Sequence, residues 1–131
     1  MSDVLLITPP DKIHNQNFSI LLVYPRETTK KHTQDFLAES KLDFNIYIYD
    51  QLPEEHNFEW LLDVARFCDL VFLDIDNCDS ETRDLTSYLV SLSHTYWLTQ
   101  SENSVYNMLS AKRVYDAASI QDIIGGKIEE R

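Results

Sequence analysis

The sequence predicts a single α/β domain in which a mostly parallel sheet lies between two layers of helices. Its 131 residues are enough for one domain with a buried core. Short apolar runs alternate with amphipathic segments along the chain, and this alternation requires crossover connections between parallel strands. The run at residues 70–73 is apolar at every position, which is typical of a strand buried on both faces in the middle of a sheet.

The first residues are expected to form an edge strand or an arm. This segment, residues 1–17, begins with a short apolar run that Pro9 and Pro10 interrupt, because proline has no N–H for a sheet ladder. Residues 18–24 (FSILLVY) follow as a largely apolar run, which predicts a buried strand that ends at Pro25.

The remaining strands and helices alternate after this point. Each further strand is a short run of apolar, β-branched or aromatic residues, and these runs are residues 44–49, 70–73, 95–99 and 113–115. Each helix follows a capping residue or a proline and has apolar residues at helical spacing, which predicts helices near residues 28–40, 53–68, 80–92, 101–109 and 119–124. The first helix should be capped by Thr28 or Thr29 and cover an edge of the sheet. Gly125 should end the last helix in a left-handed conformation.

Strands and helices connected in this way match a flavodoxin-like three-layer αβα sandwich with a mostly parallel five-stranded sheet. The expected strand order is 2-1-3-4-5, with 3-2-1-4-5 as the alternative. In both orders the carboxyl ends of the first and third strands flank one crevice. This domain is expected over residues 18–126, followed by a charged tail at residues 127–131.

The composition argues against several classes of function. A net charge of −11 without a stripe of Lys and Arg disfavours direct nucleic-acid binding. The 2 glycines are Gly125 and Gly126, so the chain has no glycine-rich phosphate loop, and no cofactor is expected. No apolar run is long enough to span a membrane, and the N-terminus lacks the charge of a signal peptide, so we expect a cytoplasmic location and no membrane partner. Cys68 and Cys78 would lie ~30 Å apart along an extended strand, too far for a disulfide.

The best candidate site follows the central strand, at the edge where ligands usually bind in open α/β sheets. Polar residues after the first and third strands of the domain form the predicted crevice: Tyr24, Arg26, Asp74, Asp76, Asn77 and Asp79. Such carboxylates could bind Mg²⁺ or act as acid and base. The alternative, which turn preferences favour, is that Asp79 caps a helix, Asp76 and Asn77 shape a turn, and Asp74 is solvated. No metal site is predicted, because the histidines lack zinc-ligand spacing and are expected at the surface or at helix ends: His14, His32, His56 and His94.

Residues 69–74 (DLVFLD), the polar turn and amphipathic helix after them, and YWLT at residues 96–99 resemble the central part of nucleoside 2-deoxyribosyltransferase-like proteins. The resemblance spans residues 18–100 and implies a flavodoxin-like fold. If the chemistry of that family is retained, Asp74 or Asp76 would hold the sugar, and Asp84 would stand nearest to the nucleophile. The start of that helix lacks the glycines of the family motif and has no glutamate in register with the family nucleophile, which argues against catalysis.

The sequence therefore favours a protein that is not an enzyme. The lack of a glycine loop and of a catalytic set, together with the acidic charge, indicates a protein-interaction or assembly subunit of the kind used in viral and other macromolecular assemblies. Its partner would be another protein or a second copy of the chain. One alternative is a deoxyribosyltransferase-like enzyme or a binder of nucleotide derivatives, in which Arg26 pairs with an anionic group. The second alternative is a pseudo-receiver signalling module, because Asp74 ends the third strand and Thr99 ends the fourth.

Overall fold

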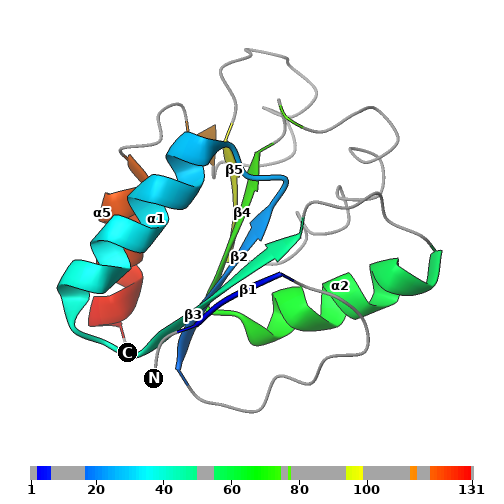
Figure 1. The fold of residues 1–131 in the computed structure, drawn as a ribbon, viewed down its shortest axis with the longest axis horizontal. Helices are drawn as coiled ribbons and strands as arrows, with labels where there is room; N and C mark the ends of the chain where they lie inside the picture. Colours follow the sequence, from blue (N-terminus) through cyan, green and yellow to red (C-terminus); the bar gives the residue numbers. More distant parts are fainter. Residues whose placement is uncertain are drawn as a thin grey trace.

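The computed structural model shows an α/β domain built on one sheet (Figure 1). The residues that the structure describes are 3–6, 17–49, 55–74, 77, 94–98, 113–114 and 119–130. Within them the strands are β1 (Asp3–Leu6), β2 (Phe18–Val23), β3 (Phe44–Tyr49), β4 (Leu70–Asp74), β5 (Thr95–Leu98) and β6 (Arg113–Val114). The helices are α1 (Glu27–Ser40), α2 (Glu55–Phe67) and α5 (Ser119–Glu129).

The sheet has the order β1-β3-β2-β4-β5-β6, and every neighbouring pair is parallel. The predicted α/β class and parallel pairing are confirmed. The sheet has six strands rather than five, because β1 pairs with the outer side of β3 and becomes an edge strand. The other five strands lie in the order β3-β2-β4-β5-β6. Numbered from β2 as the first strand of the domain, this is the expected order 2-1-3-4-5, and the alternative 3-2-1-4-5 is wrong.

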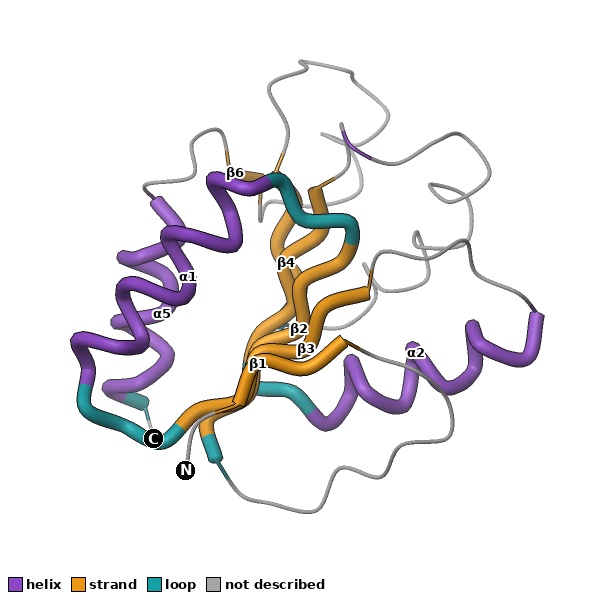
Figure 2. The backbone as a smooth tube through the Cα atoms, in the orientation of Figure 1, coloured by secondary structure: helices purple, strands orange, loops and turns teal. Residues whose placement is uncertain are grey.

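Helices lie on both faces of the sheet, with α1 and α5 on one face and α2 on the other (Figures 1 and 2). The prediction that residues 70–73 are buried is confirmed, since none of these side chains is more than 2% exposed. Alternate residues of β2 and β4 point to opposite faces, as the pleat of a strand requires. The core facing α2 includes Leu21, Val23, Val71, Leu73, Leu61 and Val64. The core facing α1 and α5 includes Ile20, Leu22, Leu70, Phe72, Leu37 and Ile124.

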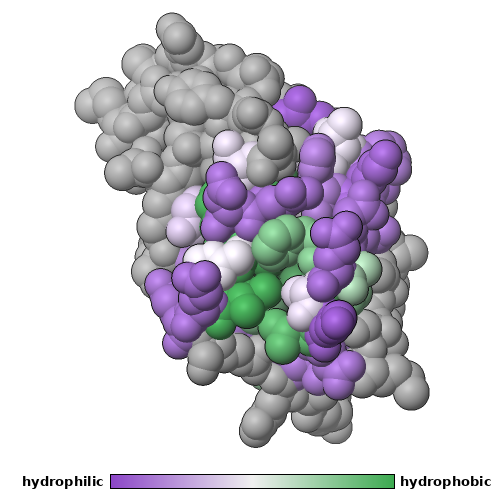
Figure 3. Space-filling view, turned by 90° about the vertical axis from the view of Figure 1, so that its left-hand side faces the viewer, coloured by the Kyte–Doolittle hydropathy of each residue, from purple (hydrophilic) through white to green (hydrophobic). Residues whose placement is uncertain are grey.

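Helix α1 begins earlier than predicted and shares its face of the sheet with α5. Its N-cap is Arg26, in an extended conformation and without a side-chain cap, whereas Thr29 lies inside the helix and is buried. The prediction that Thr28 or Thr29 caps the helix is therefore wrong. Thr33 is also buried. Its hydroxyl donates a hydrogen bond of 2.8 Å to the Thr29 carbonyl within the helix, which offsets the cost of burying a polar group. The surface on this side of the molecule is hydrophobic at its centre and bordered by hydrophilic side chains (Figure 3).

Helix α5 continues through both glycines, so the prediction that Gly125 ends it is wrong. Neither glycine has a positive φ, and the helix extends to Glu129, into the segment expected as a charged tail. The physical reason is packing: a Cβ atom on Gly125 would lie 3.4 Å from Cζ of Phe36 on α1. A Cβ atom on Gly126 would meet nothing within 4 Å. Gly125 thus allows α5 to approach α1 closely, whereas Gly126 faces open space.

The two glycines predict a contrast between two alanine variants. Gly126→Ala should raise the free energy of unfolding by about 0.5–1 kcal/mol, because alanine is the better helix former and nothing opposes its methyl group. Gly125→Ala should gain less or nothing, since its methyl group would press on the Phe36 ring. Urea unfolding of both variants measures the difference. A loss of stability in Gly126→Ala would contradict the helix as described.

Candidate functional site

The candidate site lies where the carboxyl ends of β2, β3 and β4 meet. Directly after β2, Tyr24 has a φ of 51°, which is uncommon for a residue other than glycine. Its N–H donates a hydrogen bond of 2.7 Å to the carbonyl of Tyr49 at the end of β3. The two tyrosine rings pack edge to face, with centroids 6.0 Å apart. The turn at Tyr24 is thereby fixed against the neighbouring strand, and it directs Arg26 toward β4.

Asp74 is buried at the end of β4 and contacts the start of α1. Its carboxylate is 1% exposed, and Oδ2 accepts a hydrogen bond of 2.8 Å from the backbone N–H of Arg26. Nε of Arg26 lies 3.7 Å from Oδ1, which is an ion pair but too long for a hydrogen bond. The interpretation of Asp74 as a solvated residue is therefore wrong. It accepts the N–H of the N-cap residue itself, at the end of the helix that favours negative charge.

Asn77, which follows β4, also contacts the turn at Tyr24. This exposed residue donates a hydrogen bond of 2.8 Å from Nδ2 to the carbonyl of Tyr24. The structure thus brings together four members of the predicted crevice: Tyr24, Arg26, Asp74 and Asn77. The other two members, Asp76 and Asp79, lie outside the described residues, as does the nucleophile candidate Asp84.

This arrangement is better suited to holding the chain in place than to acid–base chemistry. A catalytic carboxylate must reach substrate, but the Asp74 carboxylate faces the protein interior and accepts a backbone N–H. The Arg26 side chain, which pairs with it, is 38% exposed. Among the described residues, no group of three or more His, Cys, Asp or Glu side chains is placed to hold a metal ion.

Asp69 is the first residue of the segment that resembles the deoxyribosyltransferase-like family. It lies at the amino ends of the central strands, opposite the candidate site. It precedes β4, and its Oδ2 accepts a hydrogen bond of 2.9 Å from the N–H of Ser19 at the start of β2. The Asp69 N–H donates in return to the Ser19 carbonyl at 2.8 Å. This reciprocal pair fixes the register of the two central strands at their amino ends, so Asp69 has a structural role of its own.

His94 connects β5 to helix α2. It was expected at the surface or at a helix end, but it is half-buried just before β5. Nε2 lies 2.6 Å from the carbonyl oxygen of Ala65, and because that oxygen can only accept, Nε2 carries the proton and donates it. The His94 carbonyl also accepts the Val71 N–H at 3.0 Å. The spacing of histidines in the sequence gave no sign of this contact, because Ala65 is 29 residues away.

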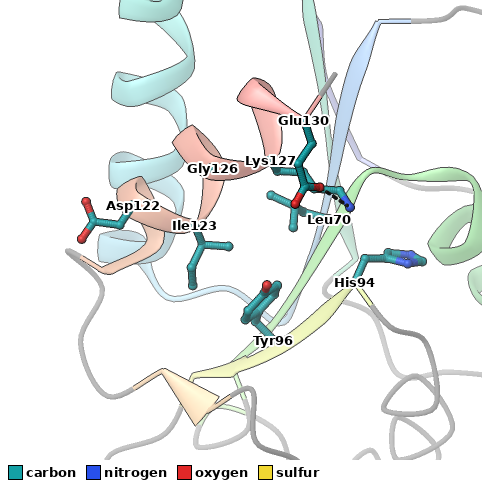
Figure 4. Close-up of a pocket in the computed structure, with 8 residues that line it drawn as sticks. All are labelled: Leu70, His94, Tyr96, Asp122, Ile123, Gly126, Lys127 and Glu130. Carbon is teal, nitrogen blue, oxygen red and sulfur yellow. Dashed lines mark ion pairs between the residues drawn. The ribbon is translucent and has the colours of Figure 1, made fainter.

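The sequence also gave no sign of a cavity of about 360 Å³ between α5 and β5 (Figure 4). Its lining includes Leu70, Tyr96, Ile123, Gly126, Lys127 and Glu130. It opens near the amino ends of β4 and β5, so it is separate from the crevice at their carboxyl ends. No pattern in the sequence marks it, because its lining comes from β4, β5 and α5, which are far apart along the chain.

The thiol of Cys68 is buried between α2 and β4, and it is a free cysteine. Burial raises its pKa far above the ordinary value of 9.0, and the Asp69 carboxylate raises the pKa further. The raised pKa keeps the thiol neutral at pH 7, where a neutral buried thiol is unreactive. This placement indicates that Cys68 is an inert core residue.

We therefore expect Cys68 to resist alkylation in the folded protein. In a Cys78→Ser variant, which leaves one cysteine, iodoacetamide at pH 7.5 should react only after urea is added. Because the folded pKa is raised, stability is retained below pH 9.0 and falls above it, by at most about 1.4 kcal/mol per pH unit, as the unfolded chain loses the thiol proton. Replacing Cys68 with alanine in that background should remove this part of the slope. Reaction at equal rates with and without urea would contradict the placement.

Comparison of the chain with protein-family models, with curated proteins and with solved structures found no match. The resemblance to nucleoside 2-deoxyribosyltransferase-like proteins therefore stays a prediction. Among the described residues, no helix combines the length and the apolar character needed to cross a membrane.

Proposed function

We propose that this chain is a non-enzymatic subunit that binds another protein chain and uses a flavodoxin-like three-layer domain as its scaffold. The observation that carries the proposal is the state of Asp74. This carboxylate stands where an open α/β enzyme would place a catalytic group, yet it is 1% exposed and accepts the Arg26 N–H. A residue committed to starting a helix in this way is not available as a general base.

The charge of the chain supports binding to a protein of opposite charge. A net charge of −11 on 131 residues produces a negative field that speeds encounter with a basic partner and repels acidic ones. The same charge disfavours substrates that carry phosphate groups unless a local cluster of basic residues overcomes it. Binding a basic protein partner would suit the role of an interaction or assembly subunit, which the sequence analysis favours.

One observation favours the alternative of a nucleotide-derivative binder. The Arg26 guanidinium is 38% exposed and stands beside the carboxyl ends of the central strands, where a ligand with an anionic group could reach it. The pseudo-receiver alternative is less well supported, because a phosphate-accepting aspartate at the end of the third strand must be open to solvent and Asp74 is buried.

A ligand screen separates the proposal from the alternative. We expect no nucleoside, nucleotide or Mg²⁺ at millimolar concentration to raise the melting temperature, whereas a ligand present at 100 times its Kd would stabilise by about 2.7 kcal/mol, a shift of several degrees. The protein from its natural source should instead elute in size exclusion together with a second protein chain. A saturable shift with one nucleotide that is lost in Arg26→Gln, and kept in the control Arg66→Gln, would overturn the proposal.

A further inference from the structure

The cavity between α5 and β5 lies beside Gly126, one of two adjacent glycines of α5. Adjacent residues of a helix point about 100° apart. Gly125 faces Phe36 of α1, and Gly126 lines the cavity, where a Cβ atom would meet nothing within 4 Å. These are the 2 glycines of the whole chain. A larger side chain at residue 126 would enter the cavity, so glycine keeps it open.

Most of the surface that lines the cavity is polar, although Ile123 and the Tyr96 ring also line it, and charged side chains lie at its mouth (Figure 4). Ile123 points from α5 toward the ring of Tyr96 on β5, and Leu70 lies behind them. At the mouth, Nζ of Lys127 lies 3.4 Å from the carboxylate of Glu130. A long side chain with an apolar stem and a charged end would fit this distribution of surfaces.

The ion pair at the mouth forms within helix α5 and is open to solvent. Lys127 and Glu130 are three residues apart on one helix, and their side chains are 36% and 69% exposed, so solvent weakens this pair and a competing cation can displace the ammonium group. A second carboxylate, that of Asp122, also lines the cavity. The net charge of −11 on the chain also favours the binding of a cationic group at this site, even with Lys127 present.

We propose that this cavity binds an arginine side chain from a basic segment of a protein partner, an inference that rests on the proposed function and names the chemistry of its partner. The arginine stem packs on Ile123, and the guanidinium group lies against the Tyr96 ring and pairs with Glu130 in place of Lys127. Arginine suits the site better than lysine because its planar group binds a carboxylate through two N–H donors and stacks on aromatic rings. Arginine is also among the residues that most often anchor protein interfaces in pockets.

The size of the cavity agrees with one side chain as its occupant. At about 360 Å³ it lies near the lower end of the ~300–1,000 Å³ range of small-molecule sites. It accommodates an arginine side chain with some water, and the rest of the partner segment would lie across α5 and the mouth.

A peptide titration followed by NMR tests the proposal. The probe is the peptide acetyl-Gly-Arg-Gly-amide, and the control is the same peptide with citrulline, which has nearly the shape of arginine but no charge. We expect the arginine peptide to cause saturable shifts of the backbone amides of Ile123, Gly126 and Tyr96. The citrulline peptide should bind at least about tenfold more weakly. Equal shifts with both peptides, or no saturable shift at these amides, would overturn the proposal.

Variants with matched controls identify the site. Gly126→Leu should abolish the shifts and Gly126→Ala should keep them, because leucine fills the cavity and neither variant disturbs the helix. Lys127→Gln should tighten binding about threefold by removing the internal competitor. Lys30→Gln, which removes a lysine from an equivalent pair with Glu27 on α1, should change it much less. An equal gain in both lysine variants would show a general charge effect and overturn the proposal.

The failure of this inference can be told apart from the failure of the proposed function. If Gly126→Leu still elutes with the natural protein partner while the peptide does not bind, the protein is an interaction subunit and the cavity is not its contact. If a nucleotide binds at Arg26 and no partner is found, the proposed function fails as well.

Discussion

Replacing Phe72 with alanine is expected to lower the free energy of unfolding by about 3–5 kcal/mol. Phe72 is 1% exposed in the middle of β4, and its ring packs against that of Tyr96 with centroids 5.9 Å apart. It belongs to the core that also contains Leu22, Leu37 and Ile124 on neighbouring elements. The loss combines the removed apolar surface with a cavity that the rigid sheet cannot close. Urea unfolding monitored by circular dichroism measures it.

Phe67 provides the matched control for this substitution. It ends α2, and its side chain is 46% exposed. Phe67→Ala removes the same atoms but creates no enclosed cavity, so we expect a loss below about 1 kcal/mol. Similar losses in the two variants would mean that β4 does not lie at the centre of the core.

Replacing Asp74 with alanine is expected to lower the free energy of unfolding by about 2–3 kcal/mol. The substitution leaves the backbone N–H of Arg26 without the carboxylate that accepts it at 2.8 Å. The ion pair with the Arg26 side chain contributes little to this loss, because the guanidinium is 38% exposed and its Nε lies 3.7 Å away. Asp74→Asn keeps an acceptor oxygen and should lose about half as much.

Asp63 is the control for the removal of a carboxylate. It lies on α2 with a side chain that is 74% exposed, and it pairs with Arg66 at 3.5 Å. Asp63→Ala should change the free energy of unfolding by no more than about 0.5 kcal/mol. If Asp74→Ala were as mild, the carboxylate would not hold the start of α1, and a functional role for it would regain support.

The central strand could be predicted from the sequence, but the role of the aspartate that ends it could not. Residues 70–73 are apolar without interruption, and a strand covered on both faces is the simplest structure that buries such a run. An aspartate at a strand end has the same sequence signal whether it faces solvent or accepts a backbone N–H. Its partner, Arg26, is 48 residues away, and that pairing depends on the turn at Tyr24.

The end of the last helix was mispredicted for a similar reason. Glycine is enriched just beyond helix ends, so Gly125 was a reasonable candidate for the stop. In the structure the helix continues through Gly125, which lies against Phe36 on α1, and packing overrides the local preference. The cavity beside Gly126 is lined by residues of β4, β5 and α5 and could not be predicted before these elements were placed together.

Hydrogen exchange at the amide of Arg26 tests most directly whether Asp74 is a structural acceptor. In the wild-type protein this amide should exchange at least about tenfold more slowly than an unprotected amide. In Asp74→Ala its protection should fall further than that of the Val71 amide in the central strand, and the amides at the start of α1 should follow it. An unprotected Arg26 amide in the wild-type protein, or equal protection in both proteins, would contradict the account.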